Sequence, residues 1–437
     1  MAVYEFSKDS TPPMPGSHLD RARRLASDGA SFADALASGE AWRRFCDGLR
    51  AAGDSILGSQ DATSPADLAE GYQFLLGAVA ALLEAELYRT DAASPAFLRT
   101  QTDVVKLAMD NPDGALMSAP LSDDGIFEIY GSVGQIRLLE LVISGGRRPE
   151  MHYLHEFEVG TEGELRITLS RDKRPGNWIG LPPGAKSVLV RRATYDWDSE
   201  EVPHLAIRRL DGEAGVLPWC LRVPTPAEMG EQLDALGTLV SENIDYWVDM
   251  VHSFRDDGDN VIQVPRPLAS TGLNSARSSV KGFFVVPRDQ ALIIEFTPPE
   301  GVFWSVSLGD IWFRTFNFSH YQTSLNGHQV ELDPDGVCRV VVAHHDPGVP
   351  NWLDTIGHEQ GVIVIRWVMV SDRPQPELRL VPFTDVESSV HPQTRRMSAE
   401  ERAATISRRR DAVAKRLAVP VTTRWSYSTS EIDPPRP

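Results

Sequence analysis

The stretch EGELRITLSRDKRPGNWIGL (Glu162–Leu181) and the stretch DGVCRVVVAHHDPGVPNWLDT (Asp335–Thr355) decide the fold, because they are two versions of one pattern. Each contains a strand-like run of alternating apolar residues and then a loop with the pair Asn-Trp. An arginine follows the asparagine fourteen positions later in the first copy (Arg191) and fifteen positions later in the second copy (Arg366). The chain therefore contains an internal repeat, which must be recognised before other features of the fold are assigned.

The repeat extends upstream of these stretches. FEIYGSVGQIRLLEL (Phe127–Leu141) parallels IIEFTPPEGVFWSVSL (Ile293–Leu308), and both read as two strands joined by a turn. We therefore predict an α+β protein with two duplicated antiparallel units of β-sandwich or jelly-roll-like form. Because the Asn-Trp pair is common to both copies, we interpret it as an architectural element.

Helical segments flank and separate the two β units. Apolar residues at helical spacing predict helices over residues 20–49 and from Ser64 to about residue 89, and Thr225 opens a connecting helix that ends near residue 254. Ser398 and Glu401 form a capping box for a basic amphipathic helix. The predicted organisation is an N-terminal helical region (1–112), a first β unit (113–222), a connecting helix and loop (223–280), a second β unit (281–388) and a C-terminal basic helix and tail (389–437).

The composition excludes several classes of partner. The formal net charge is −18 and the isoelectric point is near 5.1, whereas nucleic acids and anionic membranes attract positively charged surfaces. Three widely spaced cysteines indicate neither a thiolate metal site nor a disulfide framework. No apolar signal segment follows the N-terminus, and the most apolar run, Phe74–Leu87, is too short for a membrane span and contains two glutamates. We expect a cytoplasmic protein without a nucleic-acid partner or a membrane span.

Four short motifs in the second copy resemble a known family. They are Trp304-Ser305-Val306, Asp333-Pro334-Asp335-Gly336, Asn351-Trp352-Leu353 and Arg366. Over about residues 280–385 the chain resembles the domain of unknown function 1214 (DUF1214) family of bacterial proteins, which are common in actinobacteria, and residues 125–210 match more weakly through the repeat. The resemblance implies two β units with helical additions. It implies no particular reaction.

Polar residues that only the second copy has are the candidate catalytic groups. They lie at the end of a strand and in the loop after it: His344, His345, Asp346, Asp354 and His358. A histidine held by a nearby aspartate can act as a general acid or base near neutral pH. One of the first two histidines with His358 and Asp354 would instead form a two-histidine, one-carboxylate metal site. A third interpretation is that these side chains only tie down a proline-bounded loop by hydrogen bonds.

A second set of residues is predicted to bind a substrate. In the segment from Asp310 to Tyr321, alternate positions are occupied by Trp312, Arg314, Phe316, Phe318 and His320, so a strand there would have one aromatic face that also carries a cation and an imidazole. The candidate substrate-binding residues are Trp304, Trp312, Arg314, His320, Tyr321, Asn351, Trp352 and Arg366. Because Arg191 and Arg366 recur in both copies, we favour ion pairs with nearby carboxylates for these two arginines, with anion binding as the alternative.

The leading hypothesis is an enzyme that acts on a small, partly apolar organic substrate by acid–base chemistry of the hydrolase or lyase type. No phosphate-binding or dinucleotide fingerprint is present, so we expect no nucleotide cofactor. The first alternative is a non-catalytic module that binds a carbohydrate or lipid through tryptophans. The second alternative is an accessory subunit. Its basic helix would dock on an acidic surface of its own chain, of a partner enzyme, or of another copy in a homo-oligomer.

Overall fold

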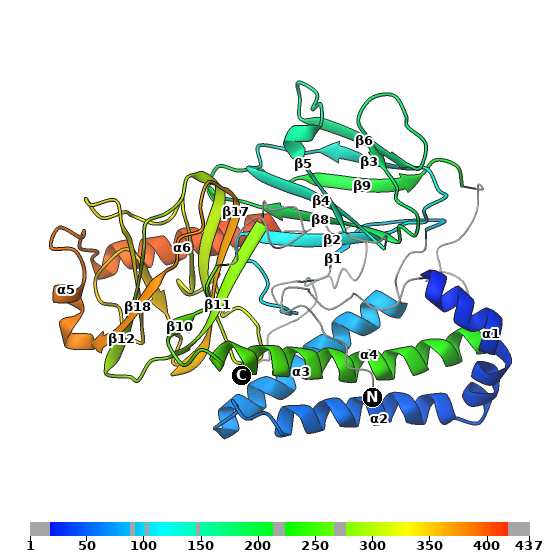
Figure 1. Ribbon diagram of the computed structural model, residues 1–437, viewed down its shortest axis with the longest axis horizontal. Helices are drawn as coiled ribbons and strands as arrows, with labels where there is room; N and C mark the ends of the chain where they lie inside the picture. The colour runs from blue at the N-terminus through cyan, green and yellow to red at the C-terminus, as the bar shows by residue number, and fades with distance from the viewer. Residues whose placement is uncertain are drawn as a thin grey trace, which may run out of the picture.

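The computed structural model describes residues 18–87, 92–99, 101, 105–145, 149–212, 223–265 and 277–417. Within these residues four long helices form a layer on one side of two β units, and a further long helix runs along the second unit and ends beside the first (Figure 1). The helices are α1 (His18–Ala37), α2 (Glu40–Leu57), α3 (Pro65–Leu87), α4 (Pro226–His252), α5 (Val386–Ser389) and α6 (Ala399–Leu417).

The first β unit consists of β1 (Leu98–Arg99), β2 (Gly114–Pro120), β3 (Phe127–Ser132), β4 (Leu138–Ser144), β5 (Glu150–Tyr153), β6 (Glu164–Ser170), β7 (Trp178–Gly180), β8 (Ser187–Ala193) and β9 (His204–Arg209). The second β unit consists of β10 (Val261–Ile262), β11 (Arg277–Val285), β12 (Gln290–Phe296), β13 (Gly301–Gly309), β14 (Ser324–Asn326), β15 (Cys338–Ala343), β16 (Trp352–Asp354), β17 (Gln360–Val370) and β18 (Glu377–Pro382). The predicted α+β class is confirmed.

The two units have the same topology. The first has sheets of order β1-β2-β8-β4-β5 and β7-β6-β3-β9, and the second has sheets of order β10-β11-β17-β13-β14 and β16-β15-β12-β18. Adding nine to each strand number converts the first unit into the second. The pairings are antiparallel except for two equivalent parallel pairs, β6 with β7 and β15 with β16. This correspondence confirms the duplicated sandwich-like units; the exact domain boundaries stay a prediction.

The Asn-Trp pair has the same architectural role in both units. Asn177 accepts a hydrogen bond from the Glu158 N–H at 2.8 Å and donates back to the Glu158 carbonyl at 2.7 Å. Asn351 makes the same pair of bonds with Glu331, at 2.9 and 2.6 Å. In both units the asparagine amide thus bonds to the N–H and the carbonyl of one backbone residue, as a neighbouring strand would. These bonds fix the loop before each short parallel strand.

The helical layer follows local sequence signals. Thr225 and Glu228 form a capping box at the start of α4, and the Ser64 hydroxyl accepts the Asp67 N–H at 3.1 Å at the start of α3. The helix predicted over 20–49 is instead two helices, α1 and α2. They separate at Gly39, whose positive φ of 73° is not compatible with a continuous helix.

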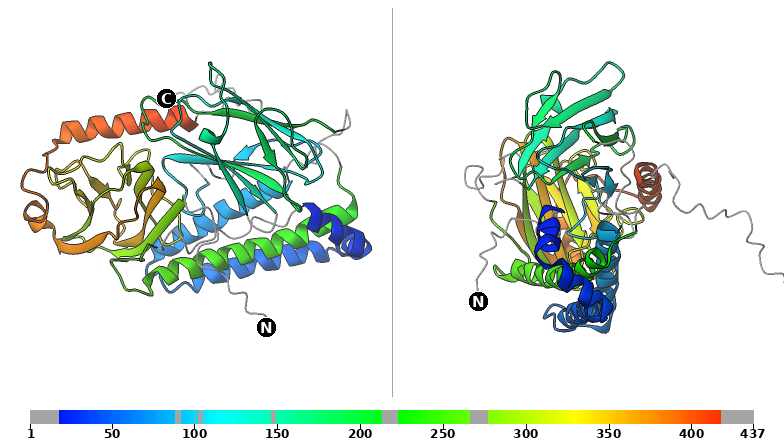
Figure 2. Two further views of the ribbon diagram at one scale, coloured as in Figure 1. Left: turned by 45° about the horizontal axis from the view of Figure 1, so that its top comes forward. Right: turned by 90° about the vertical axis from the view of Figure 1, so that its right-hand side faces the viewer.

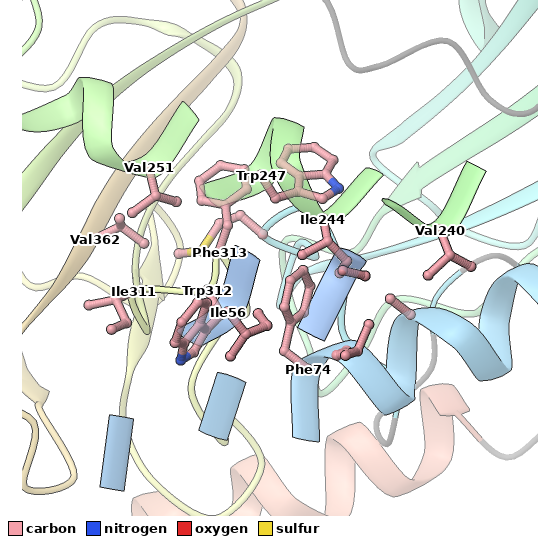
Figure 3. Close-up of a cluster of buried hydrophobic side chains, with 14 of the residues drawn as sticks. Ile56, Phe74, Val240, Ile244, Trp247, Val251, Ile311, Trp312, Phe313 and Val362 are labelled. Atoms are coloured by element: carbon pink, nitrogen blue, oxygen red, sulfur yellow. The ribbon is translucent and has the colours of Figure 1, made fainter. Parts of the chain in front are cut away.

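The largest helical core joins this layer to the second β unit (Figure 3). Trp312 and Phe313 project from the unit between α2, α3 and α4, where they contact Ile56, Phe74 and Trp247. This packing orients the second unit on the helices. The Trp312 indole N–H also donates to a backbone carbonyl of α3 at 3.0 Å.

One helix among the described residues, Pro65–Glu86 in α3, is long and apolar enough to cross a membrane by length and composition. The segment is thus longer than the apolar run seen in the sequence. Its buried face, with Phe74, Ala78 and Leu82, belongs to the helical core. The described residues therefore contain no clear membrane span.

Helix α6 runs along the outside of both β units (Figure 2). Its arginines at positions 402, 409 and 416 are spaced by seven residues and are buried against the body of the protein. Arg402 pairs with Asp346 of the second unit at 2.9 Å, and the Arg416 guanidinium lies 4.0 Å from the ring centre of Trp197 in the first unit. The predicted docking helix is therefore docked on its own chain.

Candidate functional site

The histidines predicted to be catalytic lie in two hydrogen-bonded loops, His344 and His345 directly after β15 and His358 between β16 and β17. His344 Nε2 donates to the Val286 carbonyl at 2.8 Å, and its Nδ1 lies 2.9 Å from the Thr355 hydroxyl. His345 is exposed and meets the Phe383 ring edge-on. Both ring nitrogens of His344 are occupied, so its geometry is that of a structural cross-link.

His358 connects the loop between β16 and β17 to helix α3. Its Nδ1 lies 3.1 Å from the Thr355 carbonyl, and its Nε2 lies 2.9 Å from a Glu70 carboxylate oxygen. Burial alone would lower the pKa of His358, but the hydrogen bond to Glu70 and the Glu70 charge raise it above its usual value. Because an imidazolium donates from both nitrogens, the charged ring suits these two acceptors.

The aspartates of the loop bind mainly backbone. Asp346 accepts the Gly348 N–H at 2.9 Å and pairs with Arg402, and Asp354 accepts the Ile356 N–H at 2.8 Å. Burial raises the pKa of Asp354. These are the turn-stabilising contacts that one of the three interpretations predicted for the loop. Among the described residues, no group of three or more histidine, cysteine, aspartate or glutamate side chains is placed to hold a metal ion.

The predicted aromatic face between residues 310 and 321 does not form, because this segment is irregular and Phe313 has a positive φ of 59°. Trp312, Phe316 and Phe318 enter three different cores. Arg314 pairs with Asp310 at 2.7 Å. His320 and Tyr321 are exposed. The prediction of a strand with one aromatic face was therefore wrong for this segment.

Two tryptophans predicted to bind substrate are buried in other cores. Trp304 lies inside the second sandwich. Trp352 lies against its outer side, where its indole N–H donates to the Ala343 carbonyl at 3.0 Å. Neither indole face is free at the surface.

Arg366 lies in a different place, between the two β units. The registers align Ser279, Arg366, Ser305 and Asn326 in one row across β11, β17, β13 and β14. The equivalent row of the first unit, across β2, β8, β4 and β5, contains Leu116, Arg191, Glu140 and Tyr153. We call these two rows together the inter-unit seam.

The two rows face each other. Side chains two positions apart on a strand share a face, and the neighbours of the rows pack together across the units: Leu138, Tyr153 and Ala193 contact Phe303 and Val368. Arg277 of β11 also reaches across to Glu140 of β4, with an Nη2–Oε2 distance of 2.8 Å. The duplicated outer faces of the two five-stranded sheets therefore form a polar layer inside the protein.

Neither recurring arginine forms an ion pair with a carboxylate in the part of the chain that the structure describes, which corrects the favoured expectation of ion pairs. Arg366 is buried and donates only to the Ser307 hydroxyl at 2.7 Å and the Met109 carbonyl at 2.6 Å. Among the described residues Arg191 has neither a hydrogen bond nor an ion pair. Burial lowers the pKa of both guanidinium groups to about 10, and the nearby charge of Arg277 acts in the same direction. Both groups therefore remain charged at neutral pH.

Two buried hydroxyl groups in the seam also lack hydrogen-bond partners among the described side chains and backbone. They are the Tyr153 phenol, 4% exposed, and the fully buried Ser305 side chain. Burial raises the pKa of Tyr153 to about 12, with the Glu140 charge as the next cause, so it is a neutral donor. A buried donor without an acceptor costs roughly 1–3 kcal/mol. An acceptor placed between the rows would satisfy both hydroxyls.

The rim of the seam is closed by α6. Asp113, just before β2, accepts hydrogen bonds from Trp197 at 2.8 Å and Asn326 at 2.6 Å. Burial raises the pKa of Asp113, whereas Asn326 and the α6 arginines Arg416 and Arg409 oppose that rise. Asp113 therefore connects both units to the C-terminal helix.

A pocket of about 270 Å³ lies beside this rim, between α6 and loops of both units. Its wall contains opposite charges that neutralise one another. Arg395 binds Glu331 at 2.8 Å, and His328 lies 3.6 Å from Asp196. The seam differs from this pocket because its arginines are not balanced.

Sequence reasoning found Arg366 and its counterpart but missed Glu140, Tyr153, Arg277 and Ser305. Glu140 had a detectable signal, since it is the one charge in the otherwise apolar strand LLELVIS. The other three look unremarkable in sequence. Their role depends on the packing of one sheet against the other.

The fold and the seam define a helix-flanked protein with duplicated β sandwiches. Residues 290–369, from β12 to β17, match the family described as protein of unknown function (DUF1214). This match confirms the resemblance and places a DUF1214 region in the second β unit.

A solved structure from Burkholderia cenocepacia has a similar fold. The crystal structure of an uncharacterized protein from Burkholderia cenocepacia covers 80% of this chain and 99% of that chain, with 28% identity and a TM-score of 0.74. The VPA0106 protein from Vibrio parahaemolyticus covers 76% of this chain and 100% of its own, with 15% identity and a TM-score of 0.43. No curated protein matches the chain.

Proposed function

We propose that this protein binds a small organic anion in the inter-unit seam, with Arg366 as the main anion-holding residue. The observation that carries the proposal is a buried guanidinium without a carboxylate among the described residues. An ion removed from water without a counter-ion costs several kcal/mol. Charge-assisted hydrogen bonds to a bound carboxylate would offset that cost.

The surroundings of Arg366 support a small, partly apolar ligand. Phe303 and Val368 from the second unit and Leu138 from the first give apolar walls next to the polar rows. Ligand sites commonly combine such walls with a few converging polar groups. Arg191 is only partly buried although its strand lies inside the sheet, which supports solvent access to the seam at that point.

Acid–base catalysis of the hydrolase or lyase type stays a prediction. The five residues proposed for it lie after β15 and at the end of β16, where they contact Val286, Thr355, Glu70, Arg402 and loop backbone. No contact links them to the seam among the described residues. Binding is therefore the function that the geometry favours.

The test is native mass spectrometry of the full-length protein purified at low salt, combined with thermal unfolding in the presence of small carboxylates. The wild type should retain an anionic adduct and should show a higher Tm with a bound carboxylate, because a ligand at a hundredfold excess over its Kd adds about 2.7 kcal/mol. Arg366→Met should lose both effects.

Arg408→Met is the matched control. Arg408 is an exposed arginine of α6 that donates to Thr405 and lies outside the seam. The control should behave like the wild type. Equal adducts in all three proteins, or no carboxylate response in any of them, would contradict the proposal.

A further inference from the structure

The charges at the centre of the seam do not cancel. Arg277 lies within electrostatic reach of both Arg191 and Arg366, and Glu140 is already held by Arg277 through two hydrogen bonds of 2.8 and 3.3 Å. One carboxylate against three guanidinium groups leaves two positive charges in excess. In a buried layer this excess attracts a counter-ion strongly, because the effective dielectric constant is low.

The neighbouring aspartates do not remove the excess. Asp113 lies within electrostatic reach of Arg366, but it is also shared with Arg409 and Arg416 of α6. Asp110 accepts the Thr315 hydroxyl at 2.6 Å. Adding these two carboxylates and the two α6 arginines to the count leaves the same excess of two.

The two unbalanced charges belong to opposite walls. Arg191 and Arg366 are equivalent by the duplication and lie on the facing sheets, whereas Arg277 bridges the units. Each wall has an unsatisfied hydroxyl: Ser305 is directly opposite Arg366 on the neighbouring strand, and Tyr153 follows Arg191 in its row on the far side of Glu140, which is already paired with Arg277. Each wall therefore offers one cation and one hydroxyl, which is a set of groups that suits one carboxylate.

We propose that the ligand of the seam is a dianion with two separated acidic groups, such as a small dicarboxylate, which bridges the two β units. One carboxylate binds Arg366 and Ser305, and the other binds Arg191 and Tyr153. This inference rests on the anion-binding function proposed above and specifies the ligand class for the same site. A single compact anion would neutralise one wall and leave the other unbalanced.

Calorimetric titration of the full-length protein tests the ligand class. The probes are malonate, succinate and glutarate, the monocarboxylate butyrate, and inorganic phosphate. We expect at least one dicarboxylate to bind on the order of tenfold or more tightly than butyrate and phosphate, because only it can satisfy both walls. Butyrate binding as tightly as the best dicarboxylate, or phosphate doing so, would overturn the dianion while leaving anion binding intact.

Arg191→Met separates the two proposals further. In this variant the dicarboxylate should bind no more tightly than butyrate, while butyrate affinity stays near the wild-type value through Arg366. Arg408→Met should keep the wild-type preference. An unchanged dicarboxylate preference in Arg191→Met would sink the bridging geometry, and the absence of binding by every probe to the wild type would sink both proposals.

Discussion

The arginines of the inter-unit seam differ in what their removal should do, although they share one residue type and one layer. Arg277 neutralises Glu140, which is completely buried. Arg191 forms no ion pair among the described residues and is partly buried; the Glu140 charge acts on it from the neighbouring strand, but Glu140 is already paired with Arg277. The energetic effect of each residue thus depends on its partner rather than on its own burial.

The free energy of unfolding should therefore change in opposite directions in two variants. Arg277→Met leaves Glu140 buried and unpaired, which should lower the stability of the ligand-free protein by about 3–5 kcal/mol. Arg191→Met removes an unbalanced charge and should be neutral or should stabilise the protein by about 1 kcal/mol. Urea unfolding of both variants at low salt measures the difference. Equal losses would show that Arg191 has a partner of its own.

The Glu70–His358 pair should give a pH-dependent contribution to stability. The folded pKa of His358 is raised, so the contribution is complete below about pH 6.5, the ordinary value in an unfolded chain. It is lost as the pH rises through the higher folded pKa. Unfolding measured from pH 5.5 to 8.5 should show this decline, and Glu70→Gln should flatten it. A wild-type profile as flat as the variant's would exclude the pair as a source of stability.

Among the helices, the contact of α2 with α4 depends on two glycines. A Cβ at Gly48 would collide with the backbone of Gly237 on α4. Such an approach is available only to a residue without a side chain. The core beneath it, with Phe45 and Leu236, therefore depends on the spacing of these two helices.

Two glycine-to-alanine substitutions should consequently have opposite effects. Gly48→Ala should destabilise the protein by roughly 2 kcal/mol or more, since overpacking forces the helices apart. Gly77→Ala in α3 meets no atom within 4 Å and should be neutral or stabilise by about 0.5–1 kcal/mol, because alanine favours a helix. Thermal unfolding compares them. A loss of stability in Gly77→Ala would mean that the outer face of α3 is covered.

For the molecule as a whole, α6 is the element that contacts both duplicated units from outside. In the second unit, Arg402 binds Asp346 and Arg409 binds Ser324. In the first unit, the guanidinium groups of Arg409 and Arg416 lie over the Trp197 ring. The units also touch directly at the seam. Helix and seam together should make the two β units unfold as one.

Truncation after residue 397 should loosen this coupling. Without α6 the Trp197 ring loses the Arg409 and Arg416 side chains that cover it, and Ser324 loses its donor. Hydrogen exchange should become faster at residues 195–199 and 322–330, while the core strands β3 and β12 stay protected. Unchanged exchange at the rim would show that the seam alone joins the units. The accessory-subunit hypothesis would require the same truncation to release a partner protein.

Much of the fold could be predicted because its signals are local. Capping boxes at Ser64, Thr225 and Ser398 mark helix starts whatever the rest of the chain does. Strand periodicity and the repeated Asn-Trp loop predicted the duplication of the β unit. The prediction for residues 310–321 was wrong because aromatic alternation there reflects burial in three separate cores rather than one strand face.

The site was harder to predict than the fold. The loop histidines stood out because they are rare residues that only one copy has. In the structure His344 bonds to a backbone carbonyl and His358 bonds to Glu70. Arg366 was found because it recurs. The residues around Arg366 were not found, because Tyr153 and Arg277 come from strands that are more than a hundred residues apart.

By itself the sequence determined the α+β class, the doubling of the β unit, the helix starts and the acidic charge, because each of these depends on neighbouring residues or on a count. Only the tertiary structure decided that the two equivalent sheets meet face to face and that their arginines lie between them. The reason is physical: the free energy of a guanidinium group depends on the solvent and counter-ions around it, and these are set by chain segments distant in sequence.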